Sequence, residues 1–86
     1  MNEIKHVTLD PHHAWLRMNQ RGITMDDAVL TVLHPEHVHF VKWNRLQAFR
    51  RIGDKHVQVI YELKPGDRAH ILTVKNGLQK WGGMFR

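Results

Sequence analysis

The spacing of apolar residues changes once along this chain, near Pro35, and no other sequence feature restricts the possible folds as strongly. Before Pro35, apolar residues recur every three or four positions, a spacing typical of helices with one buried face. After Pro35, apolar and polar residues alternate, a pattern typical of strands in a half-buried sheet. Helices that precede all the strands indicate an α+β fold, because a parallel α/β fold requires the two kinds of element to alternate.

Capping residues delimit two short helices in the first part of the chain. Gly22 separates them, and glycine is the usual residue just beyond a helix C-terminus. Thr24 and Asp27 have the spacing of a capping box at the start of the second helix. Pro35 ends that helix, because the residue before a proline disfavours the α conformation. The sequence therefore predicts helices over residues 10–20 and 24–34.

The later part of the chain contains four segments with strand character, joined by short turns. The clearest alternation places Val57, Val59 and Tyr61 on one face of a strand. Pro65 and Gly66 suit the two central positions of a type II turn, a tight connection between neighbouring strands. We therefore expect two N-terminal helices packed on an antiparallel sheet of three or four strands. The four predicted strands cover residues 37–43, 46–52, 56–63 and 69–75.

Length and composition limit the type of protein. The 86 residues suffice for a single domain over residues 1–86, and 42% hydrophobic residues are enough for a folded core. The absence of cysteine excludes a disulfide scaffold, a thiol nucleophile and a thiolate zinc site. No apolar run is long enough to span a bilayer, and the N-terminal segment does not resemble a signal peptide. We therefore expect no membrane partner and a cytoplasmic location. If the chain is a domain of a larger secreted effector, we expect it to act in the cytoplasm of the target cell.

The chain is basic. Thirteen Lys and Arg residues oppose eight Asp and Glu residues, which gives a net charge of +5 with histidine neutral. Eight histidines add positive charge as the pH falls below 7. This excess favours a polyanionic partner, whether a nucleic acid, an acidic protein or an anionic membrane surface. The apolar face of the first predicted helix is too narrow for the membrane alternative.

Basic and aromatic residues are interleaved in segment 40–51. Aromatic rings stack on bases and cations follow phosphates, so this mixture suits single-stranded nucleic acid. The alternative is a pair of ordinary amphipathic strands with the aromatic residues in the core. Tyr61 is a further candidate for stacking on a base, although its alternation with Val57 and Val59 indicates a core position. The basic residues of the segment are Lys42, Arg45, Arg50 and Arg51.

A histidine and two arginines share one face of the first predicted helix. His13, Arg17 and Arg21 follow one another at intervals of four residues. Histidine is the usual general acid or base near neutral pH, and RNA contains its own nucleophile in the 2′-hydroxyl. His13 and neighbouring cations could therefore cleave RNA without a metal or a cofactor. The alternative is a polar stripe that faces solvent.

A metal site is not expected. His37 and His39 share a strand face, with His34 nearby, but no cysteine or HExxH motif accompanies them. Surface histidines are the simpler interpretation.

The segment from His13 to Asp27 carries a motif that resembles a small family of uncharacterised domains. Its residues match H-A-x-x-R-M-x-x-R-G-I-[ST]-x-[DE]-[DE], and the later strands are similar to the rest of the family's pattern, over about residues 10–75. This family looks related to RelE- and BrnT-like toxins and to the barnase/EndoU/colicin/RelE group of ribonucleases. The resemblance implies a compact α+β toxin domain that cleaves tRNA or mRNA, not DNA. It also implies a neutralising partner, an antitoxin or immunity protein that we expect to be acidic.

The resemblance also implies roles for individual residues. His13 would be the general acid or base, and Arg17 would hold the phosphate. Thr73 and Lys75 would lie beside the scissile phosphate, and Arg50 or Arg51 would stabilise the charge of the transition state. RNA-binding roles would fall to Arg21, Lys42, Arg45, Arg50 and Tyr61. All of these predictions require the catalytic residues to meet in one cleft, whereas a non-catalytic module that binds RNA or protein requires only a basic surface.

Overall fold

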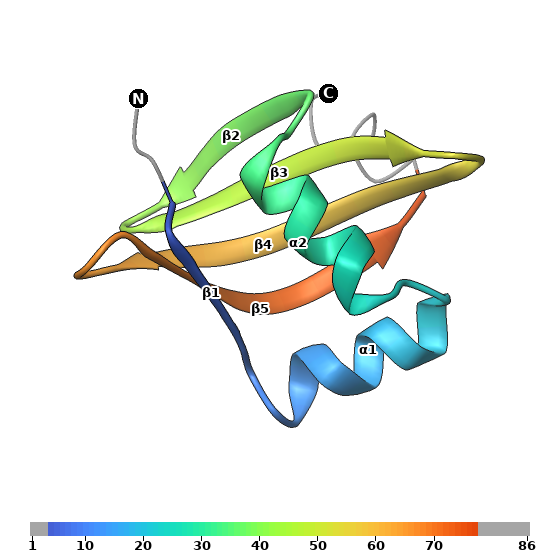
Figure 1. The fold of residues 1–86 in the computed structure, drawn as a ribbon, viewed down its shortest axis with the longest axis horizontal. Helices are drawn as coiled ribbons and strands as arrows, with labels where there is room; N and C mark the ends of the chain where they lie inside the picture. Colours follow the sequence, from blue (N-terminus) through green and yellow to red (C-terminus); the bar gives the residue numbers. More distant parts are fainter. Residues whose placement is uncertain (1–3, 78–86) are drawn as a thin grey trace.

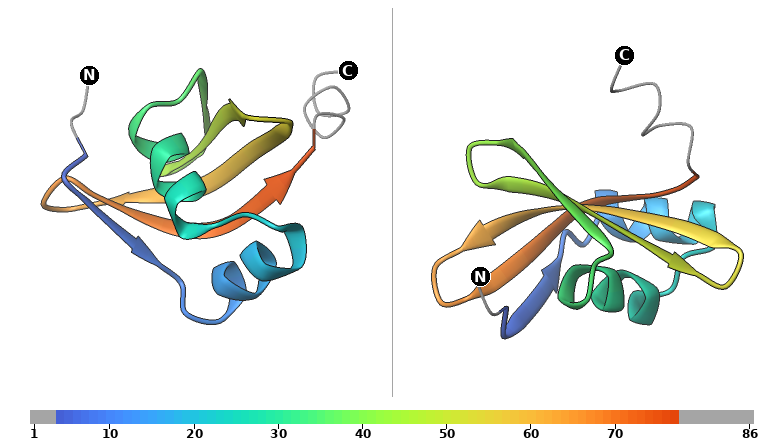
Figure 2. Two further views of the ribbon diagram at one scale, coloured as in Figure 1. Left: turned by 45° about the vertical axis from the view of Figure 1, so that its right-hand side comes forward. Right: turned by 90° about the horizontal axis from the view of Figure 1, so that it is seen from above.

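A computed structural model describes residues 4–77 of the chain as one five-stranded mixed sheet with two short helices (Figure 1). The strand order is β1-β5-β4-β3-β2, and β1 and β2 form the two edges (Figure 2). The elements in chain order are β1 (His6–Leu9), α1 (His13–Arg21), α2 (Met25–Leu33), β2 (His37–Lys42), β3 (Arg45–Ile52), β4 (Lys55–Lys64) and β5 (Arg68–Asn76).

The predicted fold, an antiparallel sheet of three or four strands that follows two helices, is wrong at the N-terminus. The chain begins with a strand, β1, which pairs in parallel with β5 and makes the sheet mixed. Val7 lies opposite Ala69, and Leu9 lies opposite Ile71. Four residues are too few for an alternating pattern to be recognised, and their partner strand is the last one of the chain. The two helices and the four later strands lie close to their predicted positions.

Local sequence signals account for the helix ends. Gly22 adopts a left-handed conformation with φ of 67° and ends α1, as its lack of a Cβ allows. The capping box of α2 forms as predicted, with Thr24 Oγ1 accepting from the Asp27 backbone N–H at 3.1 Å and the Asp27 carboxylate accepting from the Thr24 N–H at 3.2 Å. Lys55 of β4 forms an ion pair with the same carboxylate. The start of α2 is therefore attached to the sheet.

Both helices pack on one face of the sheet, α1 against β5 and α2 against β3 and β4 (Figure 1). The core lies between these two layers, and small residues such as Ala14 and Ala28 let the helices approach closely. Tyr61 belongs to this core with 4% of its surface exposed. The buried apolar residues are Ala14, Met18, Ile23, Ala28, Val32, Ala48, Val57, Val59, Tyr61, Ala69, Ile71 and Val74.

Strand register determines which side chains point away from the helices. Residues that lie opposite each other on paired strands share a face, and successive residues alternate between faces. Ala48 pairs with Val59 on the core side, so their neighbours Phe49 and Gln58 pair on the other side. A bulge in the pairing of β4 with β5 keeps both Ile71 and Val74 on the core side. We call the face opposite the helices the distal face.

Candidate nucleic-acid interface

Positive charge gathers on the distal face. Among the strand residues that the structure describes, this face carries six Lys or Arg side chains and one carboxylate, that of Glu62. Arg51 and Arg68 are exposed, whereas Arg45 and Lys75 are half-buried beside their neighbours on adjacent strands. The six distal-face cations are Lys42, Arg45, Arg51, Lys64, Arg68 and Lys75.

Aromatic and imidazole rings lie on the same face. Phe49 of β3 lies between two histidines, with its ring centroid 6.1 Å from that of His37 and 6.4 Å from that of His56. The rings of Phe49 and His56 are nearly parallel, at an interplanar angle of 10°. Register assigns five histidines to the distal face, which are His6, His37, His39, His56 and His70.

Two glutamines lie at the centre of the distal face. Gln47 and Gln58 are each only 1% exposed. The Gln47 amide nitrogen donates to the Gln58 side-chain oxygen at 2.8 Å, and the Gln58 amide nitrogen donates to the Gly77 carbonyl. Because buried amides require such partners, this chain of hydrogen bonds holds the middle of the face in one conformation.

A compact polar cluster lies at the end of the distal face nearest β1. The hydroxyl of Thr8 and Nδ1 of His70 share a hydrogen bond of 2.7 Å, and register places Glu62 directly opposite His70. Lys64 Nζ lies 3.0 Å from the Glu62 carboxylate, and this hydrogen bond lowers the pKa of Glu62, with smaller contributions from the charges of Lys64, Arg45 and His70. We call Thr8, Arg45, Glu62, Lys64 and His70 the Glu62–His70 cluster.

The predicted catalytic residues do not meet in one cleft. Thr73, Lys75 and Arg51 lie on the distal face, because they pair with the distal-face residues Ile60, Gln58 and His56. His13 and Arg17 lie on α1, which packs on the opposite side of the sheet. The sheet therefore separates the two groups, and the hypothesis of a nuclease site that combines them is not supported.

Three of the predicted RNA-binding residues also lie away from the distal face. Arg21 donates from Nη1 to the Val74 carbonyl at 3.1 Å and so joins α1 to β5. Arg50 lies on the core side of β3 and donates from Nη1 to the His34 carbonyl at 2.6 Å. Tyr61 is buried in the core, and this burial raises the pKa of its phenol. Lys42 and Arg45, the other two, lie on the distal face.

Sequence reasoning missed Glu62, His70 and Thr8. The predicted turn did not reveal the pair, because a turn with Pro65 and Gly66 as its two central residues would place Glu62 opposite Ala69. The observed loop has three residues, 65–67, and this one-residue difference places Glu62 opposite His70. Thr8 carried no signal, because its place beside His70 depends on the parallel pairing of β1.

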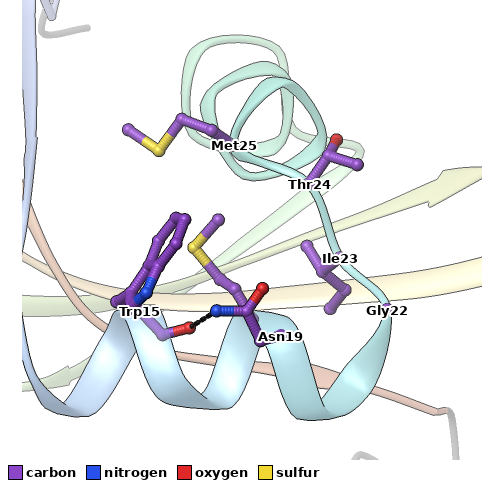
Figure 3. Close-up of a pocket in the computed structure, with 7 residues that line it drawn as sticks. Trp15, Asn19, Gly22, Ile23, Thr24 and Met25 are labelled. Carbon is purple, nitrogen blue, oxygen red and sulfur yellow. Dashed lines mark hydrogen bonds between the residues drawn. The ribbon is translucent and has the colours of Figure 1, made fainter.

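A pocket of about 420 Å³ lies on the helix side, between α1 and the start of α2 (Figure 3). Trp15 and Met25 face each other across it, and Asn19 donates from Nδ2 to the Trp15 carbonyl at 3.2 Å. Its lining contains no titratable side chain, so it offers no acid, base or cation for catalysis. The lining residues are Trp15, Met18, Asn19, Gly22, Ile23, Thr24 and Met25.

Over residues 4–77, no three His, Cys, Asp or Glu side chains are grouped closely enough to hold a metal ion. Within the same range, neither helix has the length and apolar character needed to cross a membrane.

Comparison of the chain with protein-family models, with curated proteins and with solved structures found no match. The resemblance of the segment from His13 to Asp27 to ribonuclease toxins therefore stays a prediction.

Proposed function

We propose that this protein binds single-stranded RNA across the distal face of its sheet. The observation that carries the proposal is the uneven distribution of charge, with six cations and one carboxylate on the strands of that face. Such cations follow a phosphate backbone, and the rings of Phe49 and its two histidine neighbours offer surfaces on which bases stack.

Three cations on the helix side have structural roles instead. Arg21 and Arg50 donate to backbone carbonyls, and Lys55 pairs with Asp27 at the start of α2. A phosphate that bound there would compete with contacts that join the helices to the sheet. The structural roles of these helix-side cations favour the distal face as the surface that binds a polyanion.

Binding to labelled single-stranded RNA, with DNA of the same sequence and an RNA duplex as comparisons, tests the proposal. Charge reversal on the distal face, in Arg51→Glu and Arg68→Glu, should weaken RNA binding. The matched control is Arg17→Glu on α1, which makes the same change of charge on the other side of the sheet. Equal weakening by all three variants would show that only net charge matters, and absence of binding by the native chain would refute the proposal.

The Glu62–His70 cluster favours a second function, cleavage of the bound RNA. In metal-independent cleavage, a base takes the proton of the 2′-hydroxyl while the 2′-oxygen attacks phosphorus. An acid then protonates the departing 5′-oxygen, which leaves a cyclic phosphate and a 5′-hydroxyl. Glu62, which lies directly opposite His70, suits the base, and His70, oriented by Thr8, suits the acid. Arg45 and Lys64 would stabilise the charge of the transition state.

Incubation of the purified chain with total RNA and EDTA tests this second function. Glu62→Gln and His70→Asn should abolish the cleavage while RNA binding persists. His13→Ala is the informative control, because the resemblance to ribonuclease toxins implies that it is inactive, whereas the cluster predicts full activity. Binding without cleavage by the native chain would refute the catalytic function and leave the binding function intact.

A further inference from the structure

Strand β2 forms an edge of the sheet and leaves large apolar side chains in solvent. All six of its residues are exposed, and no other strand of residues 4–77 pairs with its outer edge. Phe40 is 69% exposed and Trp43, the next residue after the strand, is 72% exposed. Natural proteins usually protect such edges with charges, proline or a covering element, because an unpaired apolar strand readily accepts another chain.

The two faces of β2 differ in chemistry. Val38 and Phe40 point to the same side as the helices, because they pair with the core-side residues Ala48 and Leu46. His37, His39 and Lys42 point to the distal face. A strand added beside β2 would therefore meet an apolar row on one face and a basic row on the other.

We propose that β2 accepts an extended segment of a partner protein as a sixth strand of the sheet, and that this segment alternates apolar and acidic side chains. The ladder of backbone hydrogen bonds would supply affinity for any extended segment. The alternation would supply selectivity, since apolar residues would lie beside Val38 and Phe40 while carboxylates would lie beside Lys42 and the two histidines.

A second copy of this chain fits the same edge poorly. In an antiparallel pair of β2 strands related by a two-fold axis normal to the sheet, the distal-face residues of both copies lie side by side. Lys42 and the histidines would then face like groups, which is unfavourable across strands. Each copy also carries a net charge of +5, so long-range repulsion opposes the pairing as well.

The test uses a synthetic, end-blocked peptide in which valine and glutamate alternate, titrated into the full chain by calorimetry. A valine–lysine peptide, and a valine–glutamate peptide with a central proline, serve as comparisons. We expect the valine–lysine peptide to bind about fivefold more weakly, because the cross-strand charge pair with Lys42 changes from attractive to repulsive. The proline peptide should bind more weakly still. Amide hydrogen exchange over residues 37–42 should slow when the valine–glutamate peptide is bound.

Two variants and one control locate the site. Phe40→Ser should weaken binding of the valine–glutamate peptide, and Lys42→Gln should reduce the preference for glutamate over lysine. Leu16→Ser is the matched control, because Leu16 is 54% exposed on α1 and distant from the edge in the fold. Equal binding of both peptides, absence of binding, or an unchanged affinity in Phe40→Ser would each overturn the proposal. Sedimentation of the free protein as a dimer that Phe40→Ser dissociates would assign the edge to a second copy instead.

Discussion

The distal-face proposal makes a quantitative prediction about salt. Each phosphate that a single strand places against a cation contributes about 0.7 to the slope of log Kd against log salt concentration, because bound counterions are released. If all six distal-face cations meet phosphates, the slope is about 4, and a fourfold rise in salt weakens binding by about 300-fold. This value is the maximum that the strands of the distal face can provide.

Single variants then change the slope in a way that depends on position. Arg68→Ala should reduce it by about 0.7, and combining Arg68→Ala with Arg51→Ala should reduce it by about 1.4. Arg17→Ala, on α1, should leave it unchanged although it removes the same charge. The assay is fluorescence anisotropy of a labelled oligouridine across a salt series at fixed pH. A native slope below about 1, or an equal loss of slope in Arg17→Ala, would refute the placement of the RNA on the distal face.

Three further predictions concern the stability of the fold. Gln47→Leu should lower the free energy of unfolding by about 1–3 kcal/mol, because it leaves the buried side-chain oxygen of Gln58 without its hydrogen-bond donor. The double variant with Gln58→Leu should be closer to native, and additive losses in urea denaturation would contradict this. Burial acts to raise the pKa of Asp27, but hydrogen bonds from Lys55 and Thr24 lower it overall. The ionised carboxylate therefore stabilises the fold fully above the ordinary aspartate pKa of about 3.9, and this stabilisation is lost as the pH falls through the lower pKa of the folded state. Lys55→Met should therefore flatten the acid side of the curve of stability against pH, and an unchanged curve would show that the ion pair is unimportant. Gly22→Ala should cost about 1 kcal/mol in thermal unfolding, because φ of 67° is strained for any residue with a Cβ; equal stability would exclude that strain.

Much of the secondary structure was predictable because its signals are local. The capping box at Thr24 and Asp27 involves residues three apart, and the alternation of Val57 and Val59 reports one buried face of one strand. Such patterns depend on neighbours along the chain, so they can be recognised without knowledge of the tertiary structure. The basic character of segment 40–51 was equally visible, and its predicted residues Lys42, Arg45 and Arg51 do lie on the distal face.

The candidate site was predicted less well, because the sequence does not show which face of the sheet each side chain occupies. Alternation separates two sets of side chains in a strand, but it does not reveal which set the helices cover. Arg50 and Arg51 are adjacent in sequence and point to opposite faces, so the same basic segment supplies one structural arginine and one candidate ligand for phosphate. The catalytic role predicted for His13 rests on the resemblance of its motif to a family, and that motif contains no information on the side of the sheet where α1 packs.

The amino-acid sequence alone determined the helices, the four later strands, the approximate positions of the turns between them and the basic character of the surface, since each depends on residues a few positions apart. Only the tertiary structure decided that the chain begins with a strand and that its sheet is mixed. It alone brought Thr8 to His70, which lie 62 residues apart. Pairing over such a separation depends on how every intervening element packs, and no short-range pattern records it.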